Sequence, residues 1–69
     1  MYIIQEIQTN DGVASLLPAV TKTGRNEAES VWHNLMSYAA VSYVHVHTVL
    51  MYDEHGNVEM CGHYEHPKE

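Results

Sequence analysis

The chain has 69 residues, with nine Asp and Glu, three Lys and Arg, and six His, and its formal net charge is −6. A chain of this length makes one small domain, residues 1–69, that is marginally stable alone. The acidic balance excludes duplex nucleic acid as a partner, because such binding uses a basic patch. The single cysteine excludes a disulfide framework within the chain. No apolar run is long enough to cross a bilayer and the start lacks a signal-peptide pattern, so we expect a cytoplasmic protein that does not bind membranes.

A β-hairpin is predicted for residues 2–20. Two strands, residues 2–9 and 13–20, lie on either side of an Asn-Asp-Gly sequence that is a strong turn signal. Pro18 has no backbone N–H to donate, so the second strand is expected at an edge of the sheet. Both faces of this hairpin carry apolar side chains.

A helix is predicted from about residue 25 to residue 40, because apolar side chains recur there with helical spacing. Asn26 and Glu29 have the spacing of a capping box, and Thr23 or Gly24 could cap the helix one turn earlier. The tryptophan should be the main anchor, since aromatic rings bury the most area. The apolar stripe consists of Ala28, Val31, Trp32, Leu35, Met36 and Ala39.

A second hairpin is predicted for residues 43–66. Gly56 can take the left-handed conformation that closes its turn, with Asp53 opposite Asn57. Alternation along the two strands then sorts the side chains into two faces. The face expected to meet the helix holds Val44, Val46, Thr48, Leu50, Tyr52, Val58, Met60, Gly62, Tyr64 and His66. The other face holds His45, His47, Val49, Met51, Glu59, Cys61, His63 and Glu65, with His47 directly opposite His63.

Together these elements predict an α+β fold of ββαββ order, a four-stranded antiparallel sheet with one helix on one face. One helix covers one face of such a sheet. The uncovered face would then expose more apolar surface than a small monomer usually shows. We therefore expect a homo-oligomer, a dimer or higher, in which the open face or an exposed edge strand pairs with a second copy about a two-fold axis.

Metal-binding chemistry is concentrated on the second face of the second hairpin. Imidazole and thiolate groups suit zinc or another transition metal, and i, i+2 spacing places paired ligands on one strand face. We therefore expect no cofactor, with bound zinc or another transition metal as the alternative. The spacing matches no established zinc pattern, so a polar or solvated stripe remains the simpler interpretation. The candidate ligands are His45, His47, Cys61 and His63.

An anion site is a second hypothesis, at the start of the predicted helix. The first amides of a helix point outward unpaired and attract anions, and two cations and a hydroxyl lie there. The candidate residues are Lys22, Thr23, Arg25 and Asn26. The sequence carries no phosphate-loop pattern, so an ordinary capped loop is the alternative interpretation.

Catalysis by Cys61 with His47 or His63 is not expected. Neighbouring positions on one strand face rarely approach within hydrogen-bond distance, and a chain this short has little room for a cavity. No catalytic residues are assigned. The six histidines also predict that the net charge of the chain changes between about pH 5 and 7. His47 and His63 would repel each other when both are protonated.

Three segments resemble a group of very small, uncharacterised accessory proteins of phages and mobile elements in gut-type bacteria: YIIQEIQTNDG, RNEAES and AAVS…HTVLMYDEHGN. The resemblance implies an accessory role in the host cytoplasm and assigns no catalytic residue. Proteins of this kind often act by binding, for example as inhibitors of host defence.

The function expected from these observations is non-enzymatic binding by a homo-oligomer. The ligand would be a host protein or a small anionic, nucleotide-type molecule. The alternative is a transition-metal-binding protein that uses the His/Cys face. A third interpretation is an interaction module whose histidines are incidental.

Overall fold

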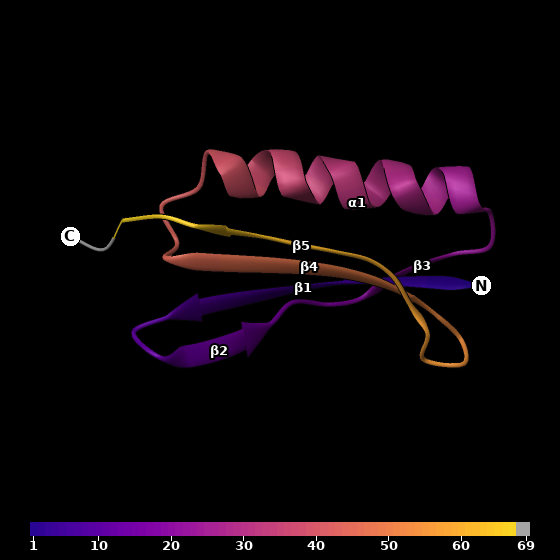
Figure 1. Cartoon of the computed structure of the whole chain (residues 1–69), viewed down its shortest axis with the longest axis horizontal. Coiled ribbons are helices and arrows are strands. Elements are labelled where there is room, and N and C mark those ends of the chain that lie inside the picture. The colour runs from indigo at the N-terminus through magenta and orange to yellow at the C-terminus, as the bar shows by residue number, and fades with distance from the viewer. Residues whose placement is uncertain (68–69) are drawn as a thin grey trace.

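Five antiparallel strands and one helix make up the fold, which is of the α+β class as predicted (Figure 1). The structure, a computed structural model, describes residues 1–67. The sheet order is β2-β1-β4-β5, and β3 also pairs with β1. The helix lies along the sheet, on one side of it (Figure 1). The elements are β1 Tyr2–Asn10, β2 Val13–Leu16, β3 Val20–Lys22, α1 Arg25–Ala40, β4 Val46–Asp53 and β5 Val58–Glu65.

The predicted second strand is divided in two, which corrects the expected number of strands from four to five. The division falls at Pro18, between β2 and β3, because proline cannot donate to the ladder. The Leu17 N–H still donates to the Glu6 carbonyl oxygen at 3.0 Å. The Leu17 carbonyl accepts from Gln5 Nε2, so a side-chain amide replaces a backbone group at the break. As predicted, this strand pair lies at a sheet edge.

The first hairpin closes with a two-residue turn. Asn10 pairs with Val13, and Asp11 and Gly12 between them have φ values of 53° and 78°. A tight turn with positive φ at both central residues matches the right-handed twist of the flanking strands. Asp tolerates this conformation better than most residues and Gly adopts it without strain.

The helix has the predicted bounds, and its predicted apolar stripe faces the sheet. Ala28 and Ala39 are fully buried, which lets the helix backbone approach the strands closely. The Trp32 Nε1–H donates to the Val49 carbonyl oxygen at 3.0 Å and ties the ring to β4. Gly24 is the N-cap and makes no side-chain cap hydrogen bond, so the predicted capping box is not formed. The core consists of Ile4, Ala28, Val49 and Met51, with Tyr2, Val31, Trp32, Leu35, Met36 and Met60 packed against it.

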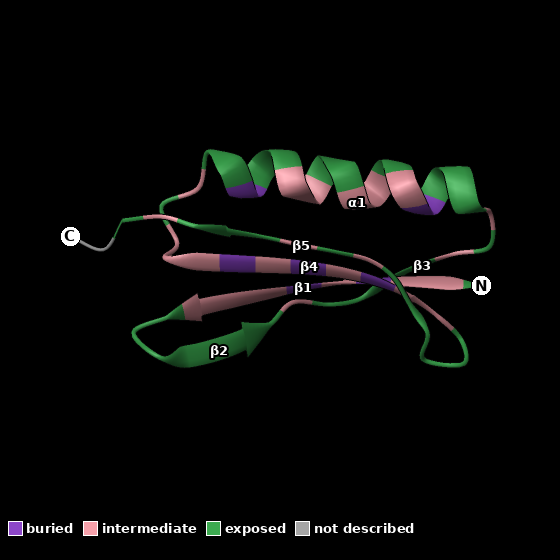
Figure 2. Cartoon of the chain, viewed as in Figure 1, coloured by how far each residue is buried: buried purple, intermediate pink, exposed green. Residues whose placement is uncertain are grey.

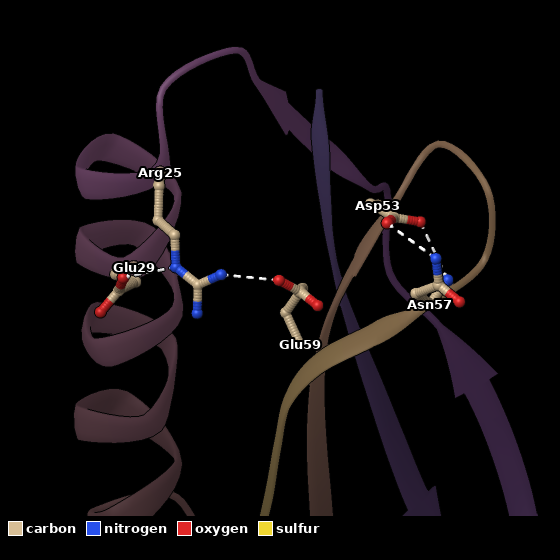
Figure 3. Close-up of polar contacts among 5 residues, drawn as sticks. All are labelled: Arg25, Glu29, Asp53, Asn57 and Glu59. Atoms are coloured by element: carbon tan, nitrogen blue, oxygen red, sulfur yellow. Dashed lines mark hydrogen bonds and ion pairs between the residues drawn. The ribbon is translucent and has the colours of Figure 1, made fainter.

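Asp53 organises the second turn. Its backbone carbonyl accepts from the Gly56 N–H at 3.0 Å, and Gly56 has the predicted left-handed conformation with φ 87°. Its carboxylate accepts from the backbone N–H of His55. It also accepts from the backbone N–H and from Nδ2 of Asn57 (Figure 3). The hydrogen bonds from Asn57, first from its backbone and then from its side chain, lower the pKa of Asp53 below its ordinary value.

We expect the Asp53→Ala substitution to lower the Tm by several degrees at neutral pH, because the turn loses three hydrogen bonds to the carboxylate. The folded-state pKa of Asp53 is lowered, so this stabilisation is complete above the ordinary Asp pKa of about 4. It is lost as the pH falls through the lower, folded-state pKa. Thermal melts of both proteins from pH 7 to pH 2 should therefore show the difference in Tm closing below about pH 4. A difference that stays constant into acid would contradict this role.

Candidate functional site

The second hairpin leaves the predicted register after its first pair. Tyr52 pairs with Val58 as expected, but a bulge follows, and Met51 then pairs with Met60. Glu59 is the extra residue on β5. From there along the hairpin, each residue of β4 faces a partner one position further along β5 than predicted. His47 therefore lies opposite Tyr64, and the prediction that it faces His63 was wrong.

The bulge reverses which face of β4 meets the helix. His47, Val49 and Met51 are buried beneath α1, whereas the sequence placed them on the open side (Figure 2). Beyond the bulge, the even positions of β5 face the helix as predicted, since a Cβ at Gly62 would lie 2.8 Å from Trp32 Cζ2. Val58, before the bulge, lies opposite Tyr52 on the other side of the sheet. Alternation then places Cys61 and His63 on the opposite side of the sheet.

The four predicted metal ligands consequently occupy three separate places. His47 is buried under the helix, and Cys61 and His63 lie on the other face. His45 lies near the base of the hairpin with its Nε2 3.6 Å from Glu65 Oε1. Within residues 1–67, no group of three or more His, Cys, Asp or Glu side chains is arranged to hold a metal ion. The geometry of a single copy therefore gives the metal hypothesis no support, and it does not bring Cys61 together with His47.

A buried hydrogen bond between a histidine and a glutamate, which the sequence analysis missed, joins β1 to β4. His47 Nδ1 lies 2.6 Å from Glu6 Oε2, and the two residues are 3% and 8% exposed. The imidazole N–H donates and the carboxylate accepts. Gln8 Nε2 donates to the same carboxylate oxygen at 3.4 Å. A signal for this pair was present, because Glu6 shares its strand face with Ile4, and a carboxylate at a core position requires a partner.

His47 Nε2 is also buried and has no hydrogen-bond partner among residues 1–67. The His66 ring approaches it edge-on, with ring centroids 6.3 Å apart. His66 Nε2 donates to the Ala39 carbonyl oxygen at 2.6 Å and so ties the strand end to the last turn of the helix. Since the helix and sheet enclose His47, we assign the Glu6–His47 pair to joining β1 and β4 inside the core and not to contact with a substrate.

Arg25, the main cation of the predicted anion site, is held by two carboxylates from its own chain (Figure 3). Its Nε donates to Glu29 Oε2 at 2.9 Å, and its NH1 donates to Glu59 Oε1 at 2.6 Å. The guanidinium also lies over the Tyr2 ring, 5.8 Å from the centroid. Glu29 first, and then Glu59, raise the pKa of Arg25 above its ordinary value. Two carboxylates therefore already offset the positive charge that would attract an anion.

The other predicted anion-site residues surround this ion pair. Lys22 lies at the end of β3, paired with Tyr2 of β1, and Thr23 is exposed in the connection to the helix. Asn26 is exposed in the first helical turn. The four residues are thus neighbours, but the charge most suited to an anion is already matched by Glu29 and Glu59.

The side of the sheet away from α1 is largely apolar, and no element of residues 1–67 covers it. Alternation from the buried positions of β1 and β4 assigns its residues. Leu16 and Val58 on this side are 73% and 60% exposed. We call this surface the open face. Its apolar side chains are those of Ile3, Ile7, Ala14, Leu16, Val46, Leu50, Tyr52, Val58 and Cys61. Its polar side chains are those of Gln5, Thr9, Thr21, Thr48, His63 and Glu65.

Comparison with protein-family models, with curated proteins and with solved structures found no match for the chain. Among residues 1–67, no helix has the length and the apolar character needed to span a membrane.

Proposed function

We propose that this chain is a non-enzymatic binding protein that works as a homo-oligomer, with the open face of one copy packed against that of a second. The observation that carries this proposal is the open face itself. Isolated apolar residues on a surface are ordinary, but a continuous apolar sheet face is typical of an interface. The sequence also predicted an uncovered apolar face, although the residues of β4 found on it differ from those expected.

The area of the open face suits a stable dimer. Nine residues of β1 at about 3.3 Å each give a length of roughly 30 Å, and four strands about 4.8 Å apart give a width of roughly 19 Å. Two such faces bury on the order of 1,100 Å², above the roughly 1,000 Å² expected of a specific interface. The core of one copy is small, with Ile4, Val49 and Met51 as its largest fully buried side chains among residues 1–67. Pairing would provide the second core that a short chain needs.

A protein is the partner class that fits this oligomer better than a small anion. The chain has a formal net charge of −6, and Arg25 is neutralised by Glu29 and Glu59. A surface of this charge attracts a basic protein and repels an anion. In the phage or mobile-element setting that the sequence resemblance implies, the partner would be a host protein in the cytoplasm.

The oligomer is tested by placing a charge at the centre of the open face. We expect Leu50→Asp to weaken self-association by about 100-fold or more, because each contact would bury two unpaired carboxylates. Light scattering coupled to size exclusion at micromolar concentration measures the change. Ser30→Asp, on the exposed side of the helix, is the matched control and should keep the wild-type mass. A wild-type mass for Leu50→Asp would overturn the open-face contact.

The partner class is tested by titrating the protein with inorganic phosphate and with ATP while recording amide shifts of residues 22–26. We expect no saturable change, since Arg25 is already engaged. A saturable change that Arg25→Glu abolishes would instead support the small-anion hypothesis. In that case the proposed preference for a protein partner is wrong.

A further inference from the structure

β5, Val58–Glu65, is the long free edge of the sheet. The strand order ends at β5, which has eight residues and pairs with β4 alone among the strands of residues 1–67. The opposite edge is divided into β2, with four residues, and β3, with three, around Pro18. A short, broken edge resists pairing with another strand, whereas a long continuous edge invites it.

A hydrogen bond just after the end of β5 shows which of its amides point outward. The His66 N–H donates to the His45 carbonyl oxygen at 2.7 Å, so this pair is hydrogen-bonded toward β4. Antiparallel pairs alternate in this respect, so the even residues of β5 direct their N–H and C=O groups at β4. The odd residues Cys61, His63 and Glu65 direct theirs away from the sheet. The bulge at Glu59 ends this alternation.

One device that protects an edge strand, the bulge at Glu59, lies near the start of β5. Residues 60–65 beyond it contain no proline, lysine or arginine. The two carboxylates of β5 lie against partners from the same chain. Glu59 binds Arg25 at 2.6 Å, and Glu65 lies 3.6 Å from His45. Cys61 and His63 between them are exposed.

We propose that β5 pairs with β5 of a second copy, antiparallel about a two-fold axis that passes midway between the two copies of His63. This register is the one that uses all three outward-pointing residues. His63 faces His63 of the second copy, and Cys61 faces Glu65 of the second copy. Each outward N–H and C=O of these three residues then has a partner, and the two five-stranded sheets become one continuous ten-stranded sheet. A second copy is the occupant because it also places Tyr64 opposite Gly62 in this register.

The helix-facing side of β5 is complementary in the same register. Tyr64, which is 41% exposed, faces Gly62 of the second copy, where Trp32 and Met36 lie over a position without a side chain. The tyrosine ring gains apolar contacts there, and an aromatic ring opposite an edge glycine is a favourable cross-strand pair.

This edge contact goes beyond the proposed open-face contact, because the two use different surfaces and neither requires the other. Open-face pairing stacks two sheets, and β5 pairing extends each sheet sideways. The two contacts together give a tetramer with perpendicular two-fold axes, a common closed arrangement.

The test uses His63→Pro, with His63→Ala as its control. Proline removes the outward N–H of residue 63 and leaves the ladder to β4 intact, because that N–H does not point at β4. We expect native mass spectrometry to show four copies for the wild type and for His63→Ala. Two copies are expected for His63→Pro and for Leu50→Asp, and one for the double variant. His63→Pro with an unchanged mass would overturn the edge contact, while Leu50→Asp with an unchanged mass would overturn the open-face contact.

A crosslinking experiment covers the case in which His63→Pro fails to fold. Hydrogen-bonded antiparallel pairs place their Cα atoms about 5.5 Å apart, within the range of a disulfide. The chain with Cys61→Ser and His63→Cys should therefore form a disulfide-linked pair on treatment with diamide, which accepts the two hydrogens of the thiols. Cys61→Ser with Ser15→Cys carries its thiol on β2 at the opposite edge, on the side away from the open face, and should stay unlinked. Equal linking of both chains would overturn the proposed edge contact.

Discussion

Replacing Glu6 with leucine is expected to lower the free energy of unfolding by about 3–5 kcal/mol, because it leaves the buried His47 without its partner. His47 is 3% exposed, and its Nδ1 lies 2.6 Å from Glu6 Oε2. A core of this size rarely provides more than about 3–5 kcal/mol in total. The variant should therefore be largely unfolded in the absence of denaturant, which urea titration followed by circular dichroism measures.

Two further variants separate the charge from the shape of Glu6. Glu6→Gln keeps an acceptor for the His47 N–H, so its cost should be smaller, on the order of 1 kcal/mol. Combining Glu6→Leu with His47→Leu removes both polar groups and should recover most of the stability lost by the first substitution. If the losses in unfolding free energy caused by Glu6→Leu and by His47→Leu simply added in the double variant, the two side chains would not act as a pair.

Replacing Gly62 with valine is expected to cost about 3 kcal/mol, the upper part of the range for overpacking a core. A Cβ at this position would lie 2.8 Å from Trp32 Cζ2 and 2.9 Å from Met36 Cε. The end of Met36 can move, but the Trp32 ring is held by its hydrogen bond to Val49. The helix must therefore shift away from β5. Urea titration should show a lower midpoint, with Gly62→Ala intermediate between valine and the wild type.

A residue of β2 provides a matched control for Gly62. Ser15 is exposed on β2, which α1 does not contact, so Ser15→Val adds a similar side chain where no helix lies. Its effect on stability should stay within about 0.5 kcal/mol. If Gly62→Val were as stable as Ser15→Val, the close approach of α1 to β5 would be contradicted.

The helix and the turns were predictable because their signals are local. The apolar spacing gives the helix bounds of residues 25–40, and the structure has the same bounds. The Asn-Asp-Gly and Asp-Glu-His-Gly-Asn sequences both form turns, with Gly12 and Gly56 at positive φ. Pro18 correctly predicted that its segment lies at an edge of the sheet. The break of that segment into β2 and β3 was not predicted.

The face of β4 could not be predicted, since both of its faces carry apolar side chains. One face has Val46, Leu50 and Tyr52, and the other has Val49 and Met51 beside two histidines. Hydrophobic alternation alone therefore favours neither register strongly. A single extra residue at Glu59 exchanged the two faces and separated the predicted His/Cys group.

The anion hypothesis depended on a charge whose partner is distant in the sequence. Arg25 and Glu29 are one helical turn apart, and that pair is readable from spacing. Glu59 lies 34 residues away and reaches Arg25 only because the bulge turns it toward the helix. The sequence therefore placed Lys22, Thr23, Arg25 and Asn26 together but did not show that the charge of Arg25 is already matched.

The sequence by itself determined the class of fold, the helix with its apolar stripe, the two turns and the presence of an uncovered apolar face. These follow from periodicity and from residues with restricted backbones, which act within a few positions of the chain. Only the tertiary structure decided that His47 is buried against Glu6, that Arg25 is held by Glu59, and that β5 is a free edge with Cys61, His63 and Glu65 pointing outward. Each of these depends on strand register, which is set by pairing between residues 37 to 51 positions apart in β1 and β4 and by one bulge in β5.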